Sequence, residues 1–119
     1  MTPAPAGQPG APARRRRLGV LLATGPLEDD FPTVQSLLQA ALADDEEASL
    51  FLMADGVRYA CDGRLTRLLL GGVDIALCAS DAEAHAIDTD AAAAAGILIG
   101  SQHDHARLLR DCDRFLSFT

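Results

Sequence analysis

The sequence contains no lysine and no tryptophan, and it has one tyrosine and four phenylalanines. Without lysine there is no P-loop phosphate ligand, no Schiff-base amine and no lysine general base. A receiver-type phosphoacceptor domain is excluded on the same ground. Scarce aromatic residues also disfavour surfaces that stack bases, and they disfavour a flavodoxin-like cofactor site, which usually needs ring stacking.

Acidic residues dominate the chain outside a single basic run. All ten basic residues are arginines, and four of them form the run Arg14–Arg17. Residues 18–119 therefore hold six arginines against all 17 acidic residues, a net charge of −11. Because such a body repels phosphate backbones, we expect no direct nucleic acid binding by the folded domain.

The chain has three cysteines, Cys61, Cys78 and Cys112, without CxxC spacing. This pattern fits neither a disulfide scaffold nor a structural zinc site, so we expect a cytoplasmic protein with no metal. No apolar segment approaches the length needed to span a bilayer, which predicts no membrane association.

The 119 residues, 49% of them hydrophobic, suffice for one domain. Residues 1–17 are rich in Pro, Ala and Arg and are predicted to form a disordered tail, with the domain covering 18–119. From residue 18, short apolar runs alternate with amphipathic stretches, which is typical of βαβ units. The pattern predicts an α/β fold with three layers (α/β/α) and a five-stranded, mainly parallel sheet, Rossmann or flavodoxin-like. The expected strands are 18–24, 48–53, 73–78, 96–100 and 114–118, and the expected helices are 32–43, 65–69, 80–95 and 106–112.

The ends of the first four expected strands point to one edge of the sheet, where ligands of open parallel sheets bind. Of these positions, only Cys78 supplies a strong nucleophile. A helix capped by Ser80-Asp81 would direct backbone N–H groups at its sulfur, an arrangement that favours a thiolate. We therefore expect Cys78 to be the most reactive thiol and to be reachable from solvent or a pocket. A buried structural thiol is the alternative.

Several other residues are weaker candidates near this edge. Asp55 either orients a substrate or makes a turn, and Cys61 is either a possible second thiol or a helix-packing residue. Ser80, His85 and Ser101 are expected to support the site. Cys112 is predicted to lie in the core. His103-Asp104-His105 is expected to serve the start of a helix rather than to bind a metal.

Four blocks in order along residues 18–119 carry a resemblance: Phe51–Val57, Gly72–Cys78, Ile99–Ser101 and Asp113–Phe118. They resemble the DsrE/DsrF/TusD family, which includes the YchN-like proteins. The resemblance implies a DsrE-like three-layer domain that assembles as a homo-oligomer, a trimer or hexamer. It also implies that Cys78 carries persulfide sulfur as a sulfur carrier or sulfurtransferase, with sulfur donor and acceptor proteins as partners and no cofactor.

The alternative function is a non-catalytic oligomeric subunit or interaction module of the same fold. Many family members have an Arg-Gly pair after the cysteine, where this chain has His85-Ala86-Ile87. The loss of this pair supports the non-catalytic alternative. The small side chains of residues 82–95 suit close packing against another subunit, so both functions predict an oligomer.

Overall fold

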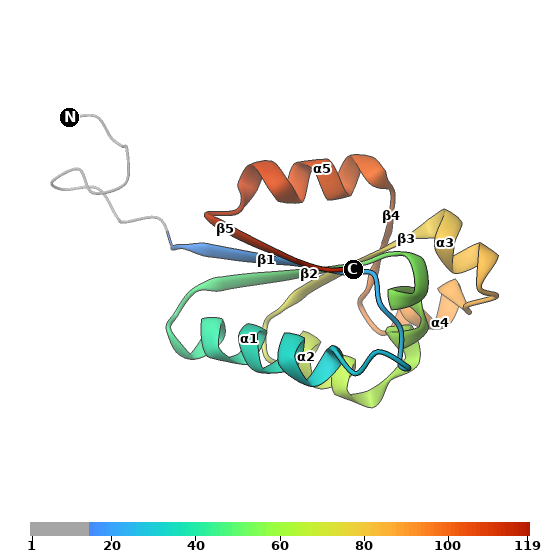
Figure 1. Cartoon of the computed structure of the whole chain (residues 1–119), viewed down its shortest axis with the longest axis horizontal. Coiled ribbons are helices and arrows are strands. Elements are labelled where there is room, and N and C mark those ends of the chain that lie inside the picture. Colours follow the sequence, from blue (N-terminus) through green and yellow to red (C-terminus); the bar gives the residue numbers. More distant parts are fainter. Residues whose placement is uncertain (1–14) are drawn as a thin grey trace, which may run out of the picture.

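The computed structural model describes residues 15–119, and five strands of it form one sheet in the order β4-β3-β2-β1-β5 (Figure 1). Every neighbouring pair is parallel, so the sheet is parallel throughout rather than mainly. The predicted α/β class and layer order are confirmed. The strands are β1 (Arg17–Leu22), β2 (Glu47–Leu52), β3 (Asp74–Cys78), β4 (Leu98–Gly100) and β5 (Arg114–Phe118).

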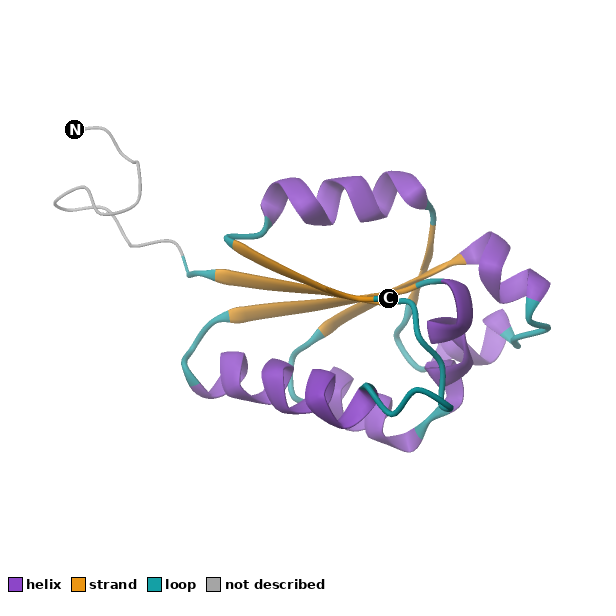
Figure 2. Cartoon of the chain, in the orientation of Figure 1, coloured by secondary structure: helices purple, strands orange, loops and turns teal. Residues whose placement is uncertain are grey.

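The helices cover the two faces of the sheet unequally (Figures 1 and 2). The connections before β4 pack on one face, and α5 (Gln102–Asp111) lies alone on the other. The elements of those connections are α1 (Phe31–Ala43), the 3₁₀ helix η1 (Ala54–Cys61), α2 (Gly63–Leu70), α3 (Ala79–Ala84) and α4 (Thr89–Ala94). One face of the sheet is therefore thickly covered and the other only in part.

Alternation along the strands divides the apolar side chains between these faces. Leu18, Val20 and Leu22 of β1 belong to the large core under α1 and α2. Leu21 points the other way and forms a small cluster with Phe51 and Cys78. No residue of α5 is buried, so this helix is held to the sheet by few apolar contacts.

The first strand begins one residue earlier than the sequence predicts. β1 starts at Arg17, and the Arg15 guanidinium donates to the backbone oxygens of Asp45 (3.0 Å) and Glu46 (3.2 Å). Arg17 pairs with Glu47 at 2.8 Å. The last arginines of the run thus contact the folded sheet. The predicted disorder of 1–14 falls outside the described residues.

The alanine-rich stretch forms two short helices instead of the single helix expected from 80 to 95. The chain turns between α3 and α4, where Ala86 has a φ of +57°. Asp88 then caps α4 by accepting from the Ala91 N–H at 3.0 Å. The predicted Ser80-Asp81 cap is also wrong, because α3 begins at Ala79 and the Asp81 carboxylate accepts from the Ala54 N–H at 2.7 Å.

Asp62 caps α2 and is held by Arg64. Its carboxylate accepts from the Arg64 backbone N–H at 2.8 Å and from the guanidinium at 2.8 and 3.1 Å. The guanidinium in turn lies 4.5 Å from the centre of the Phe31 ring. The hydrogen bonds from the Arg64 side chain lower the pKa of Asp62.

Asp62→Ala is expected to lower the free energy of unfolding by about 1 kcal/mol at pH 7, because a helix cap is lost. Since the pKa of Asp62 is lower in the folded chain, this contribution is present above the ordinary carboxyl pKa of about 3.9 and is lost as pH falls through the folded value. Urea unfolding of both proteins at pH 7, 5 and 3.5 checks this. A difference that stays constant over the three pH values would contradict it.

Candidate functional site

Cys78 lies where two neighbouring connections leave the sheet in opposite directions. It ends β3, and its register partner on β4 is Gly100. After β3 the chain enters α3, whose Ala82 is buried in the large core, whereas after β4 it turns to α5 on the opposite face (Figure 1). Such divergence at the carboxyl ends of parallel strands creates the crevice where open α/β sheets bind ligands.

The Cys78 sulfur has an apolar side and a polar side. It packs with Leu21 and Phe51, and only 3% of the residue is exposed. Its Sγ also lies 3.3 Å from the Ser80 hydroxyl and 3.9 Å from the Gln102 amide nitrogen. The expectation of a sulfur open to solvent or to a pocket is therefore wrong for this conformation, because these side chains enclose it.

Sequence reasoning missed Gln102 as a neighbour of the sulfur, and it missed His105 as a neighbour of Gln102. His105 Nδ1 lies 3.3 Å from the Gln102 carbonyl oxygen, and its ring stacks on Phe51 with centres 5.4 Å apart. His105 Nε2 is buried without a hydrogen-bond partner. The amide thus connects the imidazole to the thiol across the start of α5.

Ser101 and Asp104 fix that start through a capping box. The Ser101 hydroxyl accepts from the His103 N–H at 3.2 Å, and the Asp104 carboxylate accepts from the Ser101 N–H at 2.8 Å. That backbone hydrogen bond lowers the pKa of Asp104. The hydrogen bonds described for Ser101 lie within the start of its own helix and do not include the Cys78 sulfur, so Ser101 sets where α5 begins.

Asp55 and His85, both predicted to support the site, contact each other. His85 Nε2 lies 3.4 Å from the Asp55 carboxylate, and Arg58 lies 3.7 Å from the same oxygen. Neither Asp55 nor His85 is among the described partners of the Cys78 sulfur. They form a separate polar group on η1 and the turn after α3.

The structure excludes one of the two alternatives for Cys61 and corrects the prediction for Cys112. Cys61 is exposed at the end of η1, so it is not a helix-packing residue. Cys112 is only partly buried at the end of α5, against Gly19, which corrects its predicted place in the core. Burial raises the pKa of the Cys112 thiol. All three cysteines are free.

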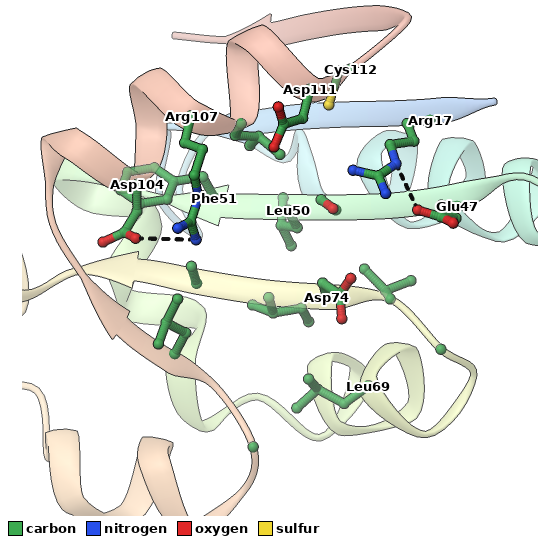
Figure 3. A pocket seen from close by; sticks show the side chains of 18 of the residues that line it. Arg17, Glu47, Leu50, Phe51, Leu69, Asp74, Asp104, Arg107, Asp111 and Cys112 are labelled. Carbon is green, nitrogen blue, oxygen red and sulfur yellow. Dashed lines mark ion pairs between the residues drawn. The ribbon is translucent and has the colours of Figure 1, made fainter. Parts of the chain in front are cut away.

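A groove of about 670 Å³ runs along the open part of the sheet beside α5 (Figure 3). Phe51, Ala76 and Leu98 line it from three neighbouring strands, and α5 contributes Asp104 and Arg107, which pair at 3.6 Å. Phe51 also belongs to the small cluster that contains Cys78. One side chain is therefore shared between the groove and the surroundings of the enclosed thiol.

Residues 15–119 contain no group of three or more side chains arranged to hold a metal ion. No helix in the same range is long and apolar enough to cross a membrane.

Comparison with known proteins identifies the fold through solved structures. No family model and no curated protein matches the sequence. A conserved protein of unknown function from Bacteroides thetaiotaomicron superposes with a TM-score of 0.71 at 17% identity, covering 86% of this chain and 94% of its own. The YchN protein from E. coli superposes with a TM-score of 0.66 at 18% identity, covering 88% of this chain and 100% of its own.

A protein of unknown function from Methanobacterium thermoautotrophicum gives a TM-score of 0.68 at 16% identity, over 88% of this chain and 100% of its own. These identities are low, but each neighbour aligns over nearly its whole length. The chain therefore has a YchN-like α/β fold, as the resemblance implied.

Proposed function

We propose that the protein is a DsrE-like sulfur carrier or sulfurtransferase that holds persulfide sulfur on Cys78. The observation that supports this proposal is the position of the thiol at the carboxyl end of β3, opposite the end of β4, with two polar side chains at its sulfur. Ser80 and Gln102 each lie within hydrogen-bond distance of the sulfur, so the thiol is not enclosed by hydrocarbon alone.

The proposed cycle consists of two thiol exchange steps. The Cys78 thiolate attacks the outer sulfur of a donor persulfide, forming Cys78–S–SH and releasing the donor as a thiolate. An acceptor thiolate then attacks that outer sulfur and releases the Cys78 thiolate. One sulfur atom is passed on without net oxidation, so the cycle requires a donor and an acceptor but no cofactor.

Access to the thiol requires a small rearrangement of α5. Gln102 is the first residue of that helix and is itself exposed, and no residue of α5 is buried. Segments with few buried apolar contacts open at low free-energy cost. We expect the Gln102 side chain to move aside when a donor docks.

A non-catalytic subunit is the second candidate, and the burial of Cys78 favours it. In that case the thiol only fills space beside Leu21 and Phe51. Intact-mass measurement after incubation with a low-molecular-weight persulfide separates the two functions. A carrier gains one sulfur of ~32 Da that maps to Cys78, whereas a subunit without this activity gains none.

We also propose a homo-oligomer, formed through the uncovered part of the sheet. Parallel sheets are normally covered on both faces, and here Leu98 on the open face is 52% exposed.

Light scattering at micromolar concentration is expected to give a multiple of 12.5 kDa. Leu98→Asp should lower that mass, and Leu27→Asp, in a loop where the leucine is 96% exposed, should not. A monomeric mass for the unmodified chain would contradict the proposal.

A further inference from the structure

We propose that Gln102 is a positioning residue whose side-chain amide donates to the Cys78 sulfur, and that His105 holds this amide in the donating orientation. The inference rests on the proposed function, because it assigns a role at the same sulfur. It adds two residues from α5, the helix on the thinly covered face.

The surroundings of His105 select one tautomer of its ring. Its Nδ1 faces the Gln102 carbonyl oxygen at 3.3 Å, and its Nε2 is buried with no partner. A proton on Nε2 would leave a buried N–H without an acceptor, which is more costly than burying a bare ring nitrogen. The tautomer with its proton on Nδ1 is thus favoured, and it donates to Gln102.

That donation fixes the Gln102 amide. With its carbonyl oxygen bound to His105, the NH₂ group faces the Cys78 sulfur at 3.9 Å. If the amide were flipped, its NH₂ would face the Nδ1–H of His105, which places two donors against each other, and its carbonyl oxygen would face the sulfur. Because Gln102 and His105 are three residues apart on one helix, they share a face, and the Ser101–Asp104 capping box holds that first turn.

The amide stabilises negative charge on the sulfur. A donor beside a thiolate favours the anion over the neutral thiol, and hydrogen bonds to charged groups are stronger than neutral ones. The thiolate attacks in the first step and leaves in the second, so one donor assists both steps. Gln102 also encloses the sulfur, and its effect as a donor must be separated from its effect on access.

The test measures the alkylation rate of Cys78 by iodoacetamide at pH 7 and pH 10, in a chain carrying Cys61→Ser and Cys112→Ser. At pH 10 an ordinary cysteine thiol is ionised, so that rate reports access alone. The ratio of the pH 7 rate to the pH 10 rate then measures how strongly the amide donor favours the thiolate over the thiol. Circular dichroism confirms that each variant is folded.

Gln102→Met, which keeps the length of the side chain, removes the NH₂ and adds no charge, is expected to lower the ratio about tenfold. His105→Phe keeps a ring on Phe51 and frees the amide, and it should lower the ratio about threefold. His103→Phe, on the same helix, is the matched control and should leave the ratio unchanged. A ratio unaltered in Gln102→Met, with both rates changed equally, would show that Gln102 only blocks access to the sulfur and would overturn the inference. Because alkylation needs no sulfur donor, this result is independent of persulfide loading.

Discussion

Cys78→Ser is expected to abolish persulfide loading, reducing the added ~32 Da species from a major fraction to an undetectable one. A serine hydroxyl is nearly the size of the thiol and can keep its contacts with Ser80 and Gln102, but it cannot form a persulfide. The fold should therefore survive while the activity is lost. Intact-mass spectrometry after incubation with a small persulfide donor provides the measurement.

The two other cysteines provide the controls for this experiment. Cys61→Ser removes the exposed thiol and Cys112→Ser removes the partly buried one, and each variant should load sulfur as the unmodified chain does. If persulfide loading disappears in Cys61→Ser and persists in Cys78→Ser, the reactive thiol is Cys61 at the end of η1 and not Cys78. Failure of the unmodified chain to load any sulfur would favour the non-catalytic subunit.

Gly56→Ala is expected to destabilise the chain by about 3 kcal/mol and to lower Tm by about 10 °C. A Cβ at Gly56 would overlap the Leu22 carbonyl, lying 2.8 Å from its carbon. Backbone cannot yield as a flexible side chain does, so η1 would have to move away from the end of β1. Thermal unfolding followed by circular dichroism measures the change.

Gly63→Ala is the matched control for this substitution. Gly63 begins α2, and a Cβ there would meet no atom within 4 Å. Because alanine reduces the freedom of the unfolded chain and favours the helix, Tm should stay the same or rise slightly. A loss of stability in Gly63→Ala as large as in Gly56→Ala would show that the close approach to Leu22 is not the cause.

The fold was predictable because its strands are continuous apolar runs. The run from Leu18 reads as a strand covered on both faces, and the glycines at 71 and 72 mark the end of a helix. The 3₁₀ helix η1 was missed, because Ala54–Cys61 has neither a helical period nor strand-like alternation. The break near Ala86 was missed as well, since nothing in an alanine-rich run indicates a left-handed residue.

The site was predictable only in its central residue. A strand end followed by a helix start placed Cys78 correctly at the edge of the sheet. Gln102 could not be assigned to it, because the contact depends on where α5 lies over the sheet. The Ser101–Asp104 spacing did signal a helix start at that point, but the expected helix began only near residue 106.

The pairing of β5 with β1 also affects how the chain is made. β1 lies between β2 and β5, and Leu18 is paired with Arg114, 96 residues later. At about 5–20 residues per second, a ribosome needs roughly 5–20 seconds to add that interval. During this time β1 has an unpaired edge, which is a template for pairing with another nascent chain. A chaperone that shields this edge until β5 emerges is expected to raise the yield of native protein.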